Sequence, residues 1–375
     1  MDRKSKCLFI LSESPWLTWM SSFFDEIDGA ITIATYGFKP QQKATTLPLG
    51  TQIEDILTWI TSHDYDSVIL LTNQSGLKRD LALGKALQRI SINAIFQGEK
   101  AARLGHDKTR MKNFFQRNGF RTPEFEIVAS VMEAINFAKH IGYPAILKTS
   151  NLSDGRKMAL VMSDEDIEEY FYENAIAEPI IMERFISGRE VSTIVYSQMN
   201  KHIVFPVVFK PKTDYLLLGR SMRGRTYISP HEAISTVERD VQDLALRVSH
   251  AVANRYFLGL DIVLDVNNIP YILEFNARIT ETLRMSMILT KVNVFKMMCE
   301  RVGLPPELET YLKPHGFVID VPCAQIKREE LKKRRGEDKI FVTFSNARAT
   351  LQGNSLEELL REAAVIHPPV LEETT

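Results

Sequence analysis

The stretch Gly259 to Arg278 reads GLDIVLDVNNIPYILEFNAR, and the rest of the chain is organised around it. It contains two apolar runs, LDIVLDV and IPYILEF, joined by Asn267 and Asn268. Asparagine tolerates a positive φ, so a short Asn-rich link between two β-prone runs is typical of a hairpin. The sequence therefore predicts two antiparallel strands connected by a two-residue turn.

Three oxygen-bearing side chains lie on one face of this predicted hairpin. Alternate residues of a strand share a face, so Glu274 and Asn276 point the same way, and Asp261 faces them from the first strand. Two carboxylates and an amide oxygen suit Mg²⁺, which would hold nucleotide phosphates. This pattern alone leaves open a surface hairpin whose polar face merely meets water.

The composition is that of an ordinary globular protein. The 375 residues are 45% hydrophobic and 25% charged, enough for about two or three domains. The 46 Lys and Arg residues balance 47 Asp and Glu residues, so no basic field favours nucleic acid or an anionic membrane. Cys7, Cys299 and Cys323 lack metal-binding spacing and suit buried thiols in a reducing cytosol. Without an apolar run of membrane-spanning length or a signal peptide, we expect a cytoplasmic protein.

Residues 1 to about 100 alternate apolar strand signals with amphipathic helix signals. The runs CLFIL, AITIAT, SVILLT and INAIF are separated by segments of helical length, which predicts a parallel sheet. LSESPW follows the first run where a dinucleotide-binding domain would carry GxGxxG, so a dinucleotide site of that kind is not supported.

The next segments carry isolated basic and acidic residues. A helix is predicted from an Asp107 N-cap to Gly119, with Lys108 and Lys112 on one face, and a solvated basic face is the simpler interpretation. Residues 124–197 predict an α+β lobe with an antiparallel sheet, in which Lys148 ends a strand. A lysine there suits a phosphate contact, although a solvated lysine is the commoner case.

The segment LLLGRSMRGRTYISP (216–230) contains Arg220, Arg223 and Arg225 without an acidic residue. Such a loop favours binding of a carboxylate or phosphate by guanidinium groups, with a plain solvated loop as the alternative. A long amphipathic helix then precedes the hairpin, and helices follow it. The break at Pro305 and Pro306 begins a last piece with strand and helix signals.

Taken in order, these motifs resemble the ATP-grasp superfamily, particularly its carboxylate–amine ligases. The resemblance covers roughly residues 100 to 300. It implies an α/β and α+β fold: a Rossmann-like parallel-sheet domain, a small nucleotide-covering lobe and a larger C-terminal lobe. We expect the N-terminal domain at 1–105, a linking helix at 106–122, the small lobe at 123–195, the large lobe at 196–304 and an extension at 305–375.

The resemblance also implies roles for individual residues. It assigns phosphate contacts to Lys108 and Lys148, adenine contacts to Glu183, Arg184 and Phe185, and the ribose to Glu190. It assigns the metal to Asp261, Glu274 and Asn276, and the transferred phosphoryl group to Arg278, with Lys148 also catalytic. The carboxylate substrate falls to Arg220, Arg223, Arg225 and Arg284.

The implied activity is an ATP- and Mg²⁺-dependent ligation, with Mn²⁺ as a substitute ion, joining a small carboxylate to an amine through an acyl phosphate. The substrates are small molecules, and a homodimer is compatible with the family. A phosphotransferase and a non-catalytic ATP-binding regulatory protein are the alternatives. The sequence departs from the family at Asn151 to Lys157, where Gly155 is the only glycine, so a backbone phosphate cradle is harder to form.

Overall fold

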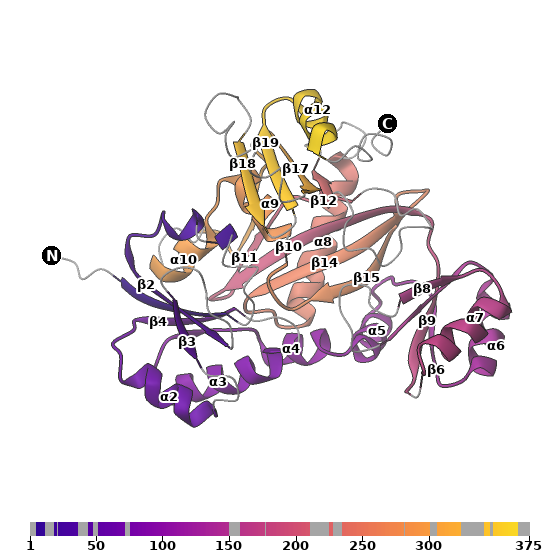
Figure 1. Ribbon diagram of the computed structural model, residues 1–375, viewed down its shortest axis with the longest axis horizontal. Helices are drawn as coiled ribbons and strands as arrows, with labels where there is room; N and C mark the ends of the chain where they lie inside the picture. Colours follow the sequence, from indigo (N-terminus) through magenta and orange to yellow (C-terminus); the bar gives the residue numbers. More distant parts are fainter. Residues whose placement is uncertain are drawn as a thin grey trace.

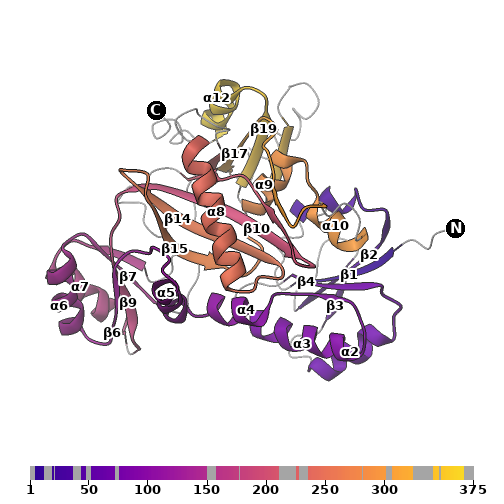
Figure 2. The same cartoon turned by 180° about the vertical axis from the view of Figure 1, so that it is seen from behind.

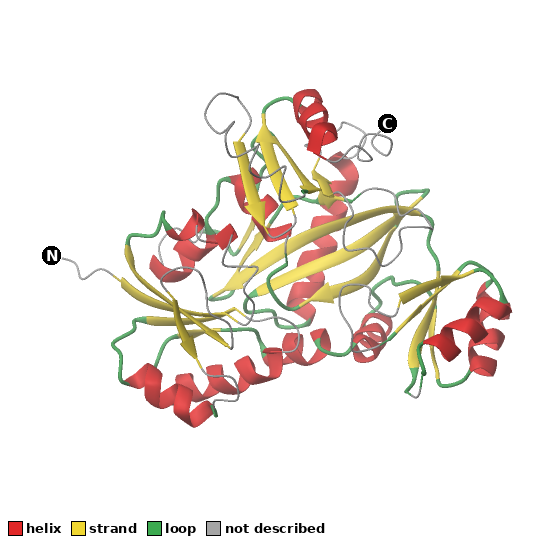
Figure 3. Cartoon of the chain, in the orientation of Figure 1, coloured by secondary structure: helices red, strands yellow, loops and turns green. Residues whose placement is uncertain are grey.

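The computed structural model describes residues 5–11, 19–20, 22–36, 44–47, 52–71, 76–149, 158–176, 178–210, 225–227, 235–280, 282–300, 306–323, 341–345 and 348–366. These residues form three β-sheets in a row, each with helices beside it (Figure 1). Figure 3 shows the large central sheet between the N-terminal sheet and a small sheet at the opposite end. None of the described helices is both long and apolar enough to cross a membrane.

The N-terminal sheet is parallel, as the alternating pattern predicted. Its strand order is β3-β2-β1-β4-β5. The run CLFIL lies in β1 and is buried along its whole length, because a central parallel strand is covered on both faces. The elements are β1 (Ser5–Leu11), β2 (Gly29–Tyr36), β3 (Ala44–Leu47), α2 (Ile53–Thr61), β4 (Ser67–Leu71), α3 (Leu77–Arg89) and β5 (Ala94–Ile95).

Two helices lead from this sheet to the rest of the chain: α4 (Glu99–Gly105) and α5 (Lys108–Arg117). The side chain of Asp107 caps α5 by accepting a hydrogen bond from the Arg110 amide, 3.1 Å away. Gly119 follows the helix with a φ of +67°, a conformation that favours glycine. The predicted start and end of this helix are therefore confirmed.

The small sheet is antiparallel, with strand order β6-β9-β7-β8, and two helices pack on it. Ser130 and Ser163 cap these helices, because their side chains accept hydrogen bonds from the backbone amides of Glu133 and Asp166. The elements are β6 (Phe125–Val128), α6 (Val131–Ile141), β7 (Ala145–Lys148), β8 (Met158–Val161), α7 (Asp164–Glu173) and β9 (Ile180–Arg184).

The central sheet follows the order β15-β14-β10-β12-β13-β17-β19-β18, with β11 and β16 beside β10. The long helix α8 crosses one face of it (Figure 2). Its strands up to the hairpin are β10 (Gly188–Gln198), β11 (Lys201–Val204), β12 (Val208–Phe209), β13 (Arg225–Tyr227), β14 (Phe257–Asp265) and β15 (Pro270–Asn276). Strand β10 pairs with β14 from Gly188 to Tyr196 and so belongs to the central sheet. The sequence had placed residues up to 195 in the small lobe.

The C-terminal strands extend the same sheet, because β17 pairs with β13 and β16 pairs with β11. Helix α12 packs on β17 and β19. The remaining elements are α8 (Ser235–Ala251), α9 (Thr282–Thr290), α10 (Val294–Glu300), β16 (Glu309–Tyr311), β17 (Phe317–Pro322), β18 (Phe341–Ser345), β19 (Arg348–Gly353) and α12 (Leu356–Ile366).

Candidate active site

Strands β14 and β15 form the hairpin that the sequence predicted, with Asp261 directly opposite Glu274. The side-chain amide of Asn276 donates to Asp261 Oδ2 at 3.1 Å. Asp261 therefore lies beside Asn276 and opposite Glu274, so the three predicted side chains are neighbours on the hairpin. The connection is longer than the expected two residues, since the strands end at Asp265 and resume at Pro270. Asp265 Oδ1 accepts from two amides of that connection, which closes the longer turn.

Each carboxylate of the hairpin faces a lysine. Lys108 Nζ lies 3.0 Å from Glu274 Oε2, and Lys210 Nζ donates to Asp261 Oδ1 at 2.8 Å. Ser192 also donates to Asp261. Burial would raise the pKa of the Glu274 carboxyl, but the nearby ammonium groups, Lys108 first, lower it to about 2. Glu274 is therefore ionised at neutral pH and able to bind a cation.

The hairpin residues fit a divalent cation only if other groups complete its shell. No three His, Cys, Asp or Glu side chains converge on a common point in the part of the chain that the structure describes. Carboxylate and amide oxygens are nevertheless the ligands that Mg²⁺ prefers, and Mg²⁺ usually takes one or two carboxylates together with phosphates and water. Asp261, Glu274 and Asn276 match that pattern.

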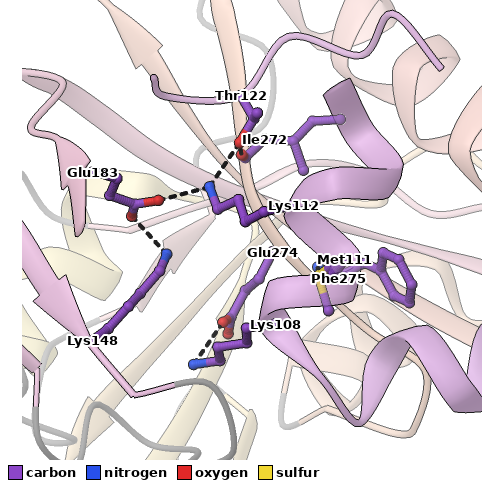
Figure 4. Close-up of polar contacts among 9 residues, drawn as sticks. All are labelled: Lys108, Met111, Lys112, Thr122, Lys148, Glu183, Ile272, Glu274 and Phe275. Carbon is purple, nitrogen blue, oxygen red and sulfur yellow. Dashed lines mark hydrogen bonds and ion pairs between the residues drawn. The ribbon is translucent and has the colours of Figure 1, made fainter. Parts of the chain in front are cut away.

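A second charged cluster lies between α5 and the small sheet (Figure 4). The Glu183 carboxylate is buried, with Oε1 2.6 Å from Lys148 Nζ and Oε2 2.7 Å from Lys112 Nζ. Burial would raise the pKa of Glu183, but Lys112 and Lys148 together lower it below its ordinary value. The cluster therefore holds two ammonium groups and one carboxylate.

A cavity of about 190 Å³ opens between the two clusters. Its lining combines apolar side chains with charged groups that come from α5 and from both sheets. Gly188 lies at the junction, where a Cβ atom would sit 1.9 Å from the Leu264 carbonyl oxygen, so only glycine lets β10 approach β14 there. The lining residues are Lys108, Ile146, Lys148, Thr149, Met158, Glu183, Arg184, Phe185, Ile186, Gly188, Glu190, Lys210, Asp261, Val263, Leu273 and Glu274.

A wider groove of about 780 Å³ lies elsewhere, between residues 116–126 and α6. Its charged lining residues include Glu124, Glu126 and His140, and none of the lysines of the two clusters borders it. Size alone would favour this groove. The convergence of lysines and carboxylates from separate elements favours the smaller cavity as the candidate active site.

The structure brings together most of the side chains that the sequence singled out. Lys108, Lys148, Glu183, Phe185, Glu190, Asp261 and Glu274 all line the cavity. Arg184 borders it, but its guanidinium group binds Glu124 Oε2 at 2.8 Å and the Ile141 carbonyl oxygen at 2.5 Å. The side chain of Arg184 is therefore already engaged by groups outside the cavity lining.

Two of the predicted arginines are not among the residues that line this cavity. Arg278 borders a smaller cavity of about 10 Å³ with Asp80, Gln97 and Tyr256, room for about one water molecule. Arg284 was expected to bind substrate, but its side chain is 1% exposed and forms an ion pair with Asp320. In this structure Arg284 joins α9 to the C-terminal strands instead of facing a ligand.

Other predicted residues lie outside the described part of the chain. Arg220, Arg223 and the loop Asn151 to Lys157 are among them. Only the backbone of Arg225 is described, in β13.

Sequence reasoning missed Lys112 and Lys210. Lys112 was interpreted as part of a solvated face, yet it is 1% exposed, because α5 packs this face between the small sheet and β15. Lys210 ends the apolar run HIVFPVVFK. The available signal was the one noted for Lys148: a lysine at the end of an apolar strand.

Comparison with known proteins agrees with this geometry. The ATP-grasp domain model matches residues 113–295. The D-alanine–D-alanine ligase of Bordetella petrii is 27% identical over 201 residues, which cover 52% of this chain and 62% of the ligase, less than two thirds of its length.

Solved structures share the whole fold at low sequence identity. N5-carboxyaminoimidazole synthetase from Staphylococcus aureus, complexed with ADP, superposes with a TM-score of 0.75 at 14% identity, covering 97% of each chain. L-amino acid ligase from Bacillus licheniformis gives a TM-score of 0.71 at 16% identity, covering 99% of this chain and 98% of that one. The predicted fold is confirmed, and residues 113–295 of this chain match the ATP-grasp domain family.

Proposed function

We propose that this chain is an ATP- and Mg²⁺-dependent ligase that joins a small carboxylate to an amine and releases ADP and phosphate. The observation that carries the proposal is the cavity between the sheets, where Lys108, Lys148 and Lys210 face the carboxylates of Glu183, Asp261 and Glu274. Such a cavity offers cations for phosphate groups and oxygens for the accompanying metal ion. A cytoplasmic location and a small-molecule amine belong to the same proposal.

The nucleotide would lie along the cavity with its base against the apolar side chains. Ile146, Met158, Phe185 and Leu273 are part of the lining, and apolar lining of this kind suits a flat aromatic base. The base edge would face the backbone after β9, and Glu190, at the start of β10, would accept from the ribose hydroxyls. The phosphates would then reach Lys148 and Lys108.

The chemistry we propose is electrostatic. A substrate carboxylate attacks the γ-phosphoryl group, and the lysines stabilise the charge that spreads over the transferring group. When bound between the hairpin and the phosphates, Mg²⁺ would neutralise phosphate charge, held by Asp261, Glu274 and Asn276. The resulting acyl phosphate must be shielded from water until the amine attacks it.

The substrate class is inferred from the relatives. Because a D-alanine–D-alanine ligase and an L-amino acid ligase are among the similar proteins, we propose an amino acid or a similar small acid as the carboxylate. Arg220, Arg223 and Arg225 are the proposed carboxylate-binding residues, and Arg278 is the proposed contact to the transferred phosphoryl group.

A substrate screen tests this function. The full chain is incubated with ATP, Mg²⁺ and mixtures of amino acids, other small acids and amines, and the release of ADP and phosphate is measured. We expect release only when a suitable acid and amine are both present, with a new amide in the mass spectrum. Transfer of phosphate to one substrate without amide formation would identify a phosphotransferase, and nucleotide binding without turnover on any mixture would identify a binding protein.

A further inference from the structure

Lys112 is a buried cation to which the proposed function gives no role. Its side chain is 1% exposed, on a face of α5 that also buries Met111 and Phe115. Placing an ammonium group there is costly unless it is well partnered. Its partners are Glu183 Oε2 at 2.7 Å and the Thr122 hydroxyl at 2.7 Å.

These contacts connect the small sheet to the hairpin strand β15 (Figure 4). Glu183 belongs to β9 of the small sheet. On the other side, the Thr122 hydroxyl donates to the Ile272 carbonyl oxygen at 2.7 Å, and the Ile272 amide donates to the Arg121 carbonyl oxygen at 2.9 Å. Lys112 is thus the middle of a continuous polar path from the small sheet to β15, the strand that carries Glu274.

The charges explain why a lysine stands there. If Lys148 were the sole partner of Glu183, the two charges would cancel, and Lys148 would have to leave a buried carboxylate in order to bind phosphate. With Lys112 on the second oxygen, the group of three carries a net positive charge. Lys148 can then turn toward a phosphate while Glu183 stays compensated.

We propose that Lys112 is a positioning residue that shares the charge of Glu183 and so leaves the Lys148 ammonium available to nucleotide phosphates. This inference rests on the proposed function, since it assumes that the cavity binds a nucleotide. Burial lowers the pKa of Lys112 to about 8, with Glu183 opposing that shift, so the side chain is still a cation at neutral pH. The other charged groups that act on it are Lys148 and Glu274.

The test compares ligands with and without phosphates. The affinities of the full chain for ADP and for adenosine are measured by calorimetry in the presence of Mg²⁺, for the wild type and for Lys112→Met. We expect Lys112→Met to weaken ADP binding by about tenfold or more, the effect of one charge-assisted contact, and to change adenosine binding by less than about twofold. Arg117→Met removes an exposed cation from the same helix and should change neither affinity.

Two further variants strengthen the test. Thr122→Val removes a hydrogen-bond partner of Lys112 while keeping the ammonium, and should weaken ADP binding by less than Lys112→Met does. This variant still tests the inference if Lys112→Met does not fold. In a Glu183→Gln background, Lys112→Met should have little further effect on ADP, because Lys112 acts through Glu183.

Equal losses for ADP and adenosine, or unchanged ADP affinity in both Lys112→Met and Thr122→Val, would overturn the inference. A wild-type chain that binds ADP but performs no ligation contradicts the proposed function alone, and the comparison of variants still decides the role of Lys112. A wild-type chain that binds no ADP overturns both.

Discussion

At the level of single residues, the charges of the cavity are already paired with one another. Lys108 is paired with Glu274 and Lys210 with Asp261, while Glu183 is shared by two lysines. A nucleotide with its metal ion would bring in both signs of charge. Each lysine could then move to a phosphate and each carboxylate to the metal, so that no buried charge is left without a partner.

This exchange makes Glu274→Gln an informative change. Glutamine keeps the shape of the side chain but loses the charge that we assign to the metal, so we expect most ATP-dependent turnover to be lost while the fold is kept. The measurement is ADP release across a Mg²⁺ titration, together with the thermal unfolding curve. Glu126→Gln, an exposed residue of β6, is the matched control. Turnover with an unaltered Mg²⁺ dependence in Glu274→Gln would contradict the metal role.

Asp80 predicts a pH dependence of stability. Its side chain is buried, and burial raises the pKa of this carboxyl from 3.8 to about 7, with Arg79 opposing the shift. The folded protein therefore binds a proton that the unfolded chain releases, so the stability linked to Asp80 is complete below about pH 4 and is lost as the pH rises through about 7.

Asp80→Asn cannot titrate and should be more stable than the wild type at pH 8, by on the order of a few kcal/mol, but not at pH 4. Urea unfolding at several pH values measures the difference, with the exposed Asp64→Asn as a control for losing a carboxylate. A difference that is constant across that range would show that Asp80 is not the titrating group.

At the level of elements, local sequence signals predicted the helices and strands better than they predicted how the side chains pack. The parallel strands, the caps at Asp107, Ser130 and Ser163, and the hairpin all follow from patterns within a few residues. The burial of Lys112 on α5 does not follow from such patterns, because it depends on Glu183, a carboxylate 71 positions away in the sequence and on the small sheet. The pairing of β10 with β14 also depends on distant contacts.

The same distinction applies to the candidate site. Most of the charged residues that line the cavity could be selected from the sequence, because their order along the chain resembles a known family. Arg184 and Arg284 could not be placed, because nothing in their neighbourhood indicates that Glu124 and Asp320 bind their guanidinium groups.

The element that carries the proposed substrate contacts is β13 with the segment before it. Arg225 lies opposite Asp320 of β17 in the sheet register. We expect the double variant Arg223→Ala and Arg225→Ala to raise KM for the carboxylate about tenfold or more, while ATP affinity stays the same, because the lost contacts bind substrate in its ground state. Steady-state kinetics with the acid found in the screen measures this, and Arg361→Ala on α12 serves as the exposed control. An unchanged KM would favour the plain solvated loop.

At the level of the whole molecule, the central sheet joins parts that are far apart in the sequence. It receives the hairpin at one edge and the C-terminal strands at the other, while α9 follows directly on the hairpin. Arg284 of α9 and Asp320 of β17 are both 1% exposed and form an ion pair, and Thr350 of β19 donates to the same carboxylate at 2.7 Å. The C-terminal strands are therefore tied to α9, the helix that follows the hairpin in the sequence.

This buried pair should control the stability of the chain more than its activity. Removing one member leaves the other charge buried with too little compensation, so Asp320→Leu and Arg284→Met should each lower the free energy of unfolding by about 3–5 kcal/mol. Replacing both removes both charges at once, so the double variant should be markedly more stable than either single variant. Urea unfolding of the four proteins gives the coupling energy, and ADP affinity at a temperature where all are folded shows whether the cavity is affected. Losses that simply add in the double variant would mean that the two side chains contribute independently, and that the C-terminal strands are held by their backbone pairing and apolar contacts alone.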